Sequence, residues 1–394
     1  MGSQQPRRCA AVLIAAALVL LAGCQGSSSY AAAGSKASSS AEVAISVADG
    51  SVDVSPATPL EVTVTGGELG DVTVADSHGK PVAGNVAPAG DDPTTAVWTP
   101  ETELAYGSAY TVTATADDAA GTTASSTFTT VTPESLATPG VGPLDGTTVG
   151  VGMPIRVFFD QPVTDKAAVE SHLVVTSSTP TDGVWNWVRD DEVHFRPSTY
   201  WPADTEVTLN ADLYGVSFGD GVWGAKDRSV TFSIGAKHVS VADAGTHTLT
   251  VYDGDQVVQT YPMSAGSDAN PTHNGAHVVL EKFADITMDS STFGLAVDAP
   301  GGYRTDVQYA TRISNNGEFV HAAPWSVAQQ GSSNVSHGCI NLSTDRAQWF
   351  YDFSQPGDVV EVVHSIGGSL SAADGDIYDW AISWHDWKAG SALS

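Results

Sequence analysis

Short runs in which apolar and polar residues alternate dominate the chain from about residue 41 onward. Examples are Glu61–Thr65, Tyr110–Ala114 and Ile155–Phe159, and Gly, Pro and Asp residues separate such runs. Successive side chains of a β-strand point to opposite faces, so this alternation predicts strands with one buried face. The turn residues recur at the spacing of an all-β sandwich. We therefore predict a mainly β fold.

A weak internal repeat relates two groups of these strands. Aligning residues 98–100 (Trp-Thr-Pro) with residues 195–197 (Phe-Arg-Pro) also places Thr111 on Thr208 without a gap. In both groups a strand follows a corner that is marked by proline. Two tandem β-sandwiches are the simplest explanation of such a repeat.

A third unit begins near Lys237. Alternating runs at 248–252 and 256–261 flank an Asp-Gly turn, which is a hairpin signal. Ser343 is placed to cap a short helix over residues 344–353. We expect the unit to be β-rich with one short helix.

The chain ends in a segment that is rich in tryptophan. Trp380, Trp384 and Trp387 are spaced to share one helical face or one apolar patch. We expect this segment to dock on a neighbouring domain, and a carbohydrate-stacking platform is the alternative.

The first residues have the pattern of an export signal. Arg7 and Arg8 precede an apolar run over residues 10–22, which is too short to span a bilayer comfortably. Residues 21–24 (Leu-Ala-Gly-Cys) resemble the bacterial lipobox, in which the cysteine is diacylated. We expect Cys24 to carry lipid and to anchor an exported protein on the outer face of the cytoplasmic membrane. An ordinary signal peptide with a chance cysteine is the alternative.

Charge and length narrow the class of protein. The sequence contains 16 Lys plus Arg against 45 Asp plus Glu, so it is a poor candidate for binding the phosphates of nucleic acid. A chain of 394 residues has room for about three domains of ordinary size.

Cysteine usage leaves one thiol to explain. Cys9 would leave with the signal peptide and Cys24 would carry lipid, so Cys339 has no partner for an internal disulfide. It is either a small buried residue or a reactive one, and the count alone does not choose between them.

The residues around Cys339 can supply the other parts of a cysteine enzyme. Such an enzyme needs a thiolate, a base, and donors for the oxyanion that forms on the attacked carbonyl. Residues 317–321 read as a strand that ends at His321, and residues 336–341 read as a tight turn. Gly338 frees this turn to direct backbone N–H groups toward one point. The candidate oxyanion donors are the N–H groups of His337, Gly338 and Cys339.

Two other interpretations of Cys339 remain. It could be an inert core residue, which is the common fate of a cysteine in a β core. It could also bind zinc with His337 and His321, although structural zinc sites favour closely spaced Cys and His pairs at both ends of a motif. We expect no metal and no organic cofactor.

The ordered set of motifs resembles a known family. His321, fourteen intervening residues and then Ser-His-Gly-Cys-Ile-Asn resemble the signature of the L,D-transpeptidase (YkuD-type) catalytic domain. Residues 288–292, 302–307 and 321–327 are similar to the mycobacterial lipoprotein L,D-transpeptidases. Those enzymes also carry two immunoglobulin-like domains and a Trp-rich C-terminal extension, so the resemblance covers nearly the whole mature chain.

The resemblance implies a domain layout. We expect two tandem immunoglobulin-like β-sandwiches followed by a β-rich catalytic domain and a C-terminal extension that packs on the preceding domains. The predicted units are a lipoprotein signal peptide (1–23), a flexible tether (24–40), immunoglobulin-like domains 1 (41–133) and 2 (134–235), the catalytic domain (236–365) and the extension (366–394).

The resemblance also implies roles for individual residues. Cys339 would be the nucleophile and His321 the general base and acid, while the turn at His337 and Gly338 would form the oxyanion hole. Tyr303 and Met288 would line a lid over the cleft. The residues that would contact or position substrate are Asn316, Gly317, Ser336, His337 and Asn341.

Two positions depart from the family pattern. Ala322 follows the base, where close relatives often have Ser, and this change is harmless if the position orients the imidazole through its backbone carbonyl. Residues 270–275 (Asn-Pro-Thr-His-Asn-Gly) replace the usual Thr-Pro-x-Gly turn, and the sequence assigns no role to His273.

The family reaction forms 3-to-3 cross-links between peptidoglycan stem peptides. Cys339 would attack the carbonyl before the terminal D-Ala, release D-Ala and pass the thioester to an amine of a second stem. Carbapenems are the expected covalent inhibitors. The alternatives are an L,D-carboxypeptidase, a transferase that attaches protein to the wall, and a non-catalytic, lipid-anchored, immunoglobulin-like binding protein.

Overall fold

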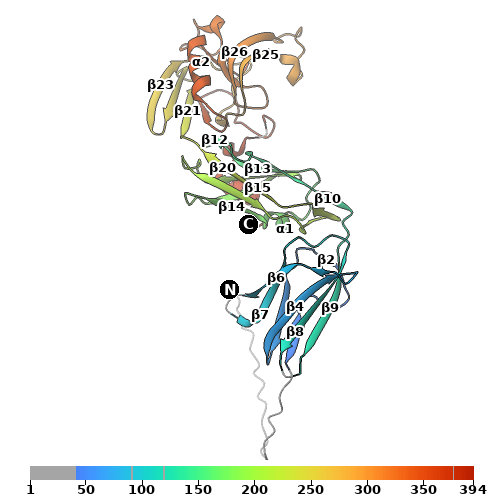
Figure 1. The fold of residues 1–394 in the computed structure, drawn as a ribbon. Helices are drawn as coiled ribbons and strands as arrows, with labels where there is room; N and C mark the ends of the chain where they lie inside the picture. Colours follow the sequence, from blue (N-terminus) through green and yellow to red (C-terminus); the bar gives the residue numbers. More distant parts are fainter. Residues whose placement is uncertain (1–40, 90–91, 119, 376) are drawn as a thin grey trace, which may run out of the picture.

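The computed structural model describes residues 41–89, 92–118, 120–375 and 377–394. The expected signal peptide, tether and Cys24 lie outside these residues. Among the described residues, no helix is long and apolar enough to cross a membrane. Strands with a few short helices make up three bodies arranged along the length of an elongated molecule (Figure 1). The predicted mainly β fold is confirmed.

The N-terminal body is a β-sandwich. One of its sheets has the strand order β1-β3-β7-β6 and the other β2-β9-β8-β4-β5. Trp98, Val112 and Phe128 lie in the core between the sheets. The strands are β1 (Glu42–Ile45), β2 (Ser51–Val54), β3 (Leu60–Thr65), β4 (Glu68–Asp76), β5 (Pro81–Val82), β6 (Gly84–Ala89), β7 (Asp92–Pro100), β8 (Ala109–Asp117) and β9 (Thr123–Thr130).

The second body repeats this topology. Its sheets β11-β13-β16-β15 and β12-β20-β17-β14 match the first sandwich strand for strand, apart from the added β5, and β10-β19-β18 forms a small third sheet. Trp98 lies on β7 and Phe195 on β16, which hold the same place in their sheets, so the internal repeat was real. The elements are β10 (Ser135–Ala137), β11 (Pro139–Gly142), β12 (Thr148–Val149), β13 (Ile155–Phe159), α1 (Lys166–Glu170), β14 (Leu173–Ser177), β15 (Gly183–Arg189), β16 (Glu192–Pro197), β17 (Glu206–Ala211), β18 (Ser217–Gly219), β19 (Val222–Gly224) and β20 (Arg228–Ile234).

The third body contains two sheets and helix α2. The sheets have the orders β23-β22-β21-β29-β24 and β25-β26-β27-β28. Its elements are β21 (His238–Asp243), β22 (Thr248–Asp253), β23 (Gln256–Pro262), β24 (Gly275–Val278), β25 (Lys282–Asp289), η1 (Ser290–Phe293), β26 (Arg304–Arg312), β27 (Phe319–Ala322), η2 (Pro324–Ser326), β28 (Ile340–Leu342), α2 (Thr344–Phe353) and β29 (Val359–Val363), and the C-terminal extension that follows adds η3 (Asp379–Ala381) and α3 (Trp384–Ala389).

The predicted hairpin and helix of this body are confirmed, but the helix cap is wrong in detail. Strands β22 and β23 pair across Gly254, whose φ is +58°. Ser343 occupies the N-cap position of α2 without a side-chain bond to the backbone of the helix. Its hydroxyl donates to Asp345 Oδ1 at 2.6 Å, within the first turn of the helix.

Glycines allow the second sandwich to approach the third body closely. The N–H of Gly152 donates to Gly357 O at 2.8 Å. A Cβ added to Gly150 would lie 2.2 Å from Asp358 N, so no larger residue fits there. Val359 on β29 joins the apolar core of the second sandwich. The two bodies therefore share a packed interface.

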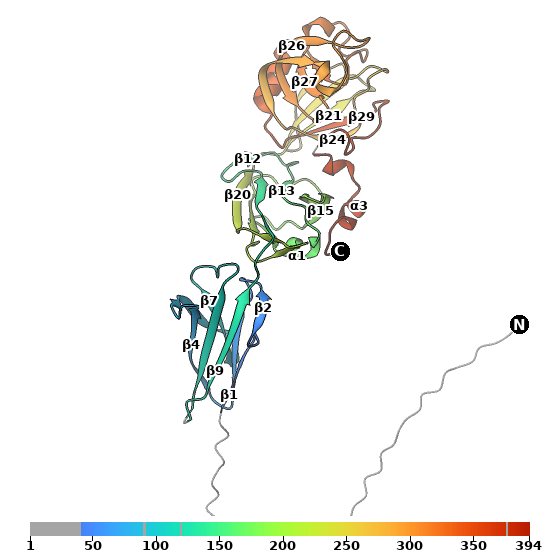
Figure 2. The same cartoon turned by 90° about the vertical axis from the view of Figure 1, so that its right-hand side faces the viewer.

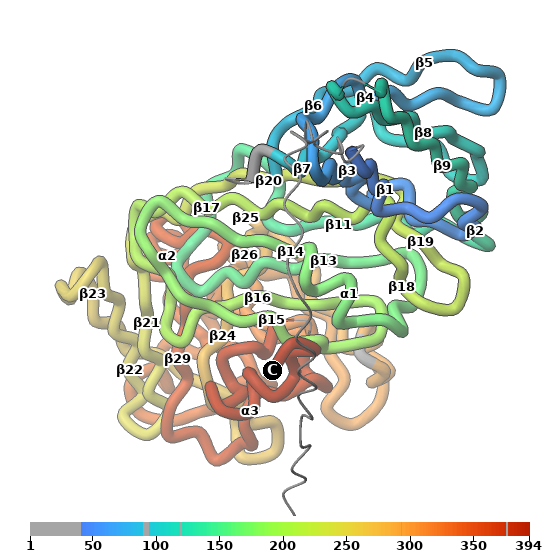
Figure 3. Tube along the Cα trace, turned by 90° about the horizontal axis from the view of Figure 1, so that it is seen from below, coloured from blue at the N-terminus to red at the C-terminus, as the bar shows by residue number. Residues whose placement is uncertain are grey.

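The C-terminal extension returns to the second sandwich. Figures 2 and 3 show α3 beside β15. The three tryptophans surround the buried guanidinium of Arg196, whose Cζ lies 4.7 Å from the ring centre of Trp380, 5.3 Å from that of Trp384 and 4.5 Å from that of Trp387. Cation–π contacts of this kind are strongest when they are desolvated.

Candidate active site

Cys339 lies at the end of a tight turn that leads into β28. It is a free cysteine, and only 6% of its surface is exposed. Gly338 has a φ of +117°, a conformation that strongly favours glycine. Ser336 Oγ accepts the N–H of Gly338 at 3.1 Å and donates to Cys339 O at 2.6 Å. These bonds hold the backbone on both sides of the thiol.

Parallel pairing of two short strands places the histidine near the cysteine. His321 on β27 is the register partner of Asn341 on β28, two residues beyond Cys339. The Nδ1–H of His321 donates to Ala322 O at 2.9 Å. The backbone carbonyl of residue 322 therefore orients the imidazole, as we inferred for the departure from Ser. This bond leaves Nε2 as the basic nitrogen.

Burial sets the protonation states of the Cys339 thiol and the His321 imidazole. Loss of solvent raises the pKa of the Cys339 thiol to about 12, and the Glu318 charge adds to the rise, whereas a hydrogen bond from the Phe319 backbone opposes it. Loss of solvent lowers the pKa of His321 to about 4. The thiol and the imidazole are therefore both neutral near pH 7, and the imidazole is ready to accept a proton.

A pocket of about 320 Å³ brings these groups together. The ring of Tyr303 lies 5.1 Å from that of His337, and burial raises the pKa of the Tyr303 phenol to about 12. Met288 at the end of β25 packs in one apolar cluster with Cys339. The pocket is lined by Met288, Tyr303, Thr305, Val307, His321, Trp325, Val335, Ser336, His337, Cys339 and Asn341.

Three of the predicted residues make contacts that the sequence did not indicate. Cys339 Sγ donates to the Gly317 carbonyl oxygen at 3.6 Å, and Gly317 lines a second pocket to which Met288 and Tyr303 also contribute. Asn316 Nδ2 donates to Asp374 Oδ1 at 3.0 Å, in the C-terminal extension. The N–H of Gly338 donates to Ser336 Oγ, so it can reach an oxyanion only by leaving that bond.

Sequence reasoning gave no role to Trp325. This side chain lines the pocket, 59% of it is exposed, and its ring lies 6.1 Å from that of His321. Its place four residues after His321, within the segment that carries the family resemblance, was the available signal. Within the described ranges, no group of three or more His, Cys, Asp or Glu residues is arranged to hold a metal ion.

Comparisons with known proteins agree with this geometry. Residues 237–362 match the family described as the L,D-transpeptidase catalytic domain, and residues 51–217 match a bacterial Ig domain. The fold and site thus define an enzyme that carries immunoglobulin-like domains ahead of an L,D-transpeptidase domain.

The similar proteins narrow the class further. L,D-transpeptidase 2 of Mycobacterium tuberculosis is 43% identical over 348 residues, which are 88% of this chain and 84% of that protein. L,D-transpeptidase 5 of the same species is 41% identical over 355 residues, with coverages of 88% and 76%. The structure of L,D-transpeptidase LdtMt1 in complex with imipenem is 38% identical, has a TM-score of 0.51, and covers 57% of this chain and 97% of that chain. This chain belongs to the L,D-transpeptidase family, so it is a peptidoglycan enzyme and not a non-catalytic binding protein.

Proposed function

We propose that this L,D-transpeptidase forms 3-to-3 cross-links through a thioester on Cys339. The supporting observation is that Cys339 and His321 line one pocket, where the bond to Ala322 leaves Nε2 of His321 basic. Cys339 Sγ attacks the carbonyl between the diaminoacyl residue and the terminal D-Ala of a stem tetrapeptide. The thiol proton passes to His321 and then to the departing amine of D-Ala.

The second half of the reaction transfers the acyl group to an amine. The side-chain amine of a second stem loses a proton to His321 and attacks the thioester, which forms the cross-link and restores the thiol. The N–H groups of His337 and Cys339 are the proposed oxyanion donors. The N–H of Gly338 joins them if Ser336 Oγ releases it.

An L,D-carboxypeptidase or a protein-to-wall transferase would use the same thioester with another acceptor. The lid favours a stem amine over water. Met288 and Tyr303 cover the thiol with apolar surface, and a partly dry, oriented cleft raises the effective concentration of a bound amine.

Intact-mass spectrometry with a donor tetrapeptide whose side-chain amine is blocked, so that no acceptor is present, tests this function. The parent should gain the mass of the stem without its D-Ala, and Cys339→Ser should gain nothing. Because the relative LdtMt1 has been solved in complex with imipenem, we also propose that carbapenems acylate Cys339. An adduct that persists on the Cys339→Ser variant would contradict the assignment.

We further propose that acyl chains on Cys24 anchor the enzyme on the outer face of the cytoplasmic membrane. The lipobox-like residues 21–24 support this placement. Cys24→Ala should move the protein from the membrane fraction to the soluble fraction. If the variant stays with the membrane, the apolar run before Cys24 is itself the anchor.

A further inference from the structure

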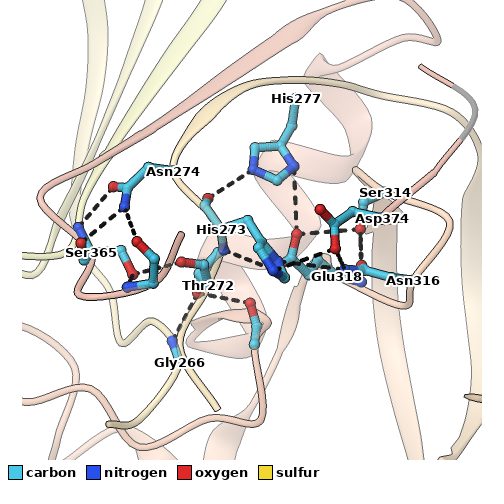
Figure 4. Close-up of polar contacts among 12 residues, drawn as sticks. Gly266, Thr272, His273, Asn274, His277, Ser314, Asn316, Glu318, Ser365 and Asp374 are labelled. Carbon is cyan, nitrogen blue, oxygen red and sulfur yellow. Dashed lines mark hydrogen bonds and ion pairs between the residues drawn. The ribbon is translucent and has the colours of Figure 1, made fainter. Parts of the chain in front are cut away.

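A cluster of polar side chains lies behind the turn that bears Cys339. We call it the His273 cluster, and it comprises His273, Asn316, Glu318 and Asp374 (Figure 4). The proposed chemistry uses none of these side chains, and sequence analysis assigned no function to His273. Their contacts connect the catalytic turn to the C-terminal extension.

His273 binds the Glu318 carboxylate in two ways. Its backbone N–H and its Nδ1 both lie 2.9 Å from Glu318 Oε1 (Figure 4). Glu318 is 4% exposed, whereas the His273 side chain is 31% exposed, so the carboxylate is shielded from water and the imidazole is partly shielded. A charge-assisted hydrogen bond is stronger when it is shielded from water.

The residue before His273 holds the catalytic turn directly. Thr272 Oγ1 donates to Gly338 O at 2.8 Å and accepts the N–H of Gly266 at 2.9 Å. Glu318 lies against the same turn, because a Cβ added to Gly338 would lie 3.7 Å from Glu318 Cγ. Thr272 therefore bonds to Gly338, and His273 bonds to Glu318, which follows the residue whose carbonyl oxygen contacts the thiol.

The charge of Glu318 acts on the nucleophile. Its carboxylate contributes to the raised pKa of Cys339, after burial, because a negative charge opposes formation of a thiolate nearby. The hydrogen bond to Glu318 raises the pKa of His273, and the Asp374 charge adds to this. An imidazolium at His273 offsets the Glu318 carboxylate that faces Cys339.

The extension completes the cluster. Asp374 Oδ1 lies 3.4 Å from His273 Nε2 and accepts Asn316 Nδ2 at 3.0 Å. The same segment continues to Asp379, which contacts the second sandwich. His277 also faces the cluster: its Nε2 lies 3.0 Å from His273 O and its Nδ1 lies 3.6 Å from Glu318 Oε2.

We propose that His273 is a positioning residue that fixes the catalytic turn against the C-terminal extension and neutralises the Glu318 carboxylate beside Cys339. The inference rests on the proposed role of Cys339 as the nucleophile. The proposed role is specific to this chain, because His273 lies where the sequence departs from the turn that is usual in the family.

The rate at which imipenem acylates the enzyme, measured by intact-mass spectrometry between about pH 5.5 and 9, distinguishes an electrostatic role of His273 from a purely structural one. His273→Gln keeps a polar side chain but cannot become positive. Near pH 6 its acylation should be slower than that of the parent by about tenfold, because the uncompensated Glu318 carboxylate opposes the negative charge that develops on sulfur during attack by the equivalent of about one pKa unit. The difference should shrink as the pH rises through the raised pKa of His273, because the parent then loses the same positive charge. A purely structural role would lower the rate equally at every pH.

Two further variants test the charge directly. Glu318→Gln should speed acylation at the alkaline end of the range, since it removes the opposing charge and retains the side-chain shape. His273→Gln combined with Glu318→Gln should regain the parent rate near pH 6. His364→Gln is the matched control, because it removes a histidine–carboxylate pair of 3.0 Å with Asp243 at the surface of the same body.

The outcomes are distinct. A ratio of His273→Gln to parent rates that does not change with pH, or a double variant no faster than the single one, would overturn the role of His273. Should His273→Gln fail to fold, an unchanged alkaline rate in Glu318→Gln would do the same. A parent that imipenem never acylates would instead contradict the proposed function of Cys339.

Discussion

At the scale of single residues, burial decides how the reaction begins. The pKa of Cys339 is raised to about 12 and that of His321 is lowered to about 4, so the thiol and the imidazole that line one pocket are both neutral near pH 7. A neutral imidazole can take the thiol proton as the sulfur attacks, whereas an imidazolium could not. In the proposed reaction the thiol proton is therefore transferred during attack, and no preformed thiolate is needed.

His321→Ala should lower kcat/KM by about 10²- to 10⁴-fold, the usual contribution of a positioned general base. The parent should stay active well below pH 6.5, because His321 accepts a solvent proton only as the pH approaches its pKa of about 4. A pH–rate series on both proteins measures this, with His364→Ala as a surface control. If the variant and parent profiles coincide, another residue is the base.

Individual contacts were the least predictable part of the site. The sequence motif placed Cys339 and His321 correctly at one pocket, because the strand and the turn that carry them are local features. It could not show that Asn316 binds Asp374, since that contact joins residues 58 positions apart and depends on how the extension folds back. The sequence therefore predicted the residues proposed to react, but not the contacts of the surrounding side chains.

At the scale of elements, alternation and turn residues predicted some of the strands and helix α2. The strand Ile155–Phe159 and the helix Thr344–Phe353 have the expected bounds. The parallel pairing of β27 with β28, which aligns the catalytic residues, had no signal because its partners are only four and three residues long. Tertiary packing, and not local propensity, creates this pair.

The lid formed at the ends of β25 and β26 should control the choice of acceptor. Tyr303→Ala opens the pocket to water, so the ratio of cross-linked dimer to tripeptide should fall. Tyr303→Phe keeps the ring and should retain the parent ratio. Mass analysis of the products at a fixed acceptor concentration gives both ratios. Equal ratios for the parent and Tyr303→Ala would contradict the lid role of Tyr303.

At the scale of the whole molecule, the extension links the catalytic body to the second sandwich through a buried ionic contact. His194 Nδ1 lies 3.0 Å from Asp379 Oδ2, and its Nε2 lies 2.7 Å from Glu192 Oε1. Burial alone would lower the pKa of His194, but the two carboxylates outweigh it and raise the pKa to about 9. His194 and Asp379 lie 185 residues apart, beyond the reach of local sequence patterns.

This contact predicts how stability depends on pH. The pKa of His194 rises from 6.5 to about 9 on folding, so its contribution is full below pH 6.5 and is lost as the pH rises through 9. His194→Gln should lose about 3 to 5 kcal/mol near pH 6, as expected when a buried charge loses its partner. Thermal unfolding should show this deficit shrinking toward pH 9.5 or so. A deficit that is constant with pH, or equal to that of the exposed control His172→Gln, would contradict the ionic contact.

The most direct test of the central claim is the product that purified enzyme makes from a disaccharide-tetrapeptide. The account predicts a dimer whose mass equals two donors minus one D-Ala, with a bond between the third residues of both stems, and no dimer from Cys339→Ser. Tripeptide as the main product at every acceptor concentration would show a carboxypeptidase, and dimer formation by Cys339→Ser would show that the thioester is not the route.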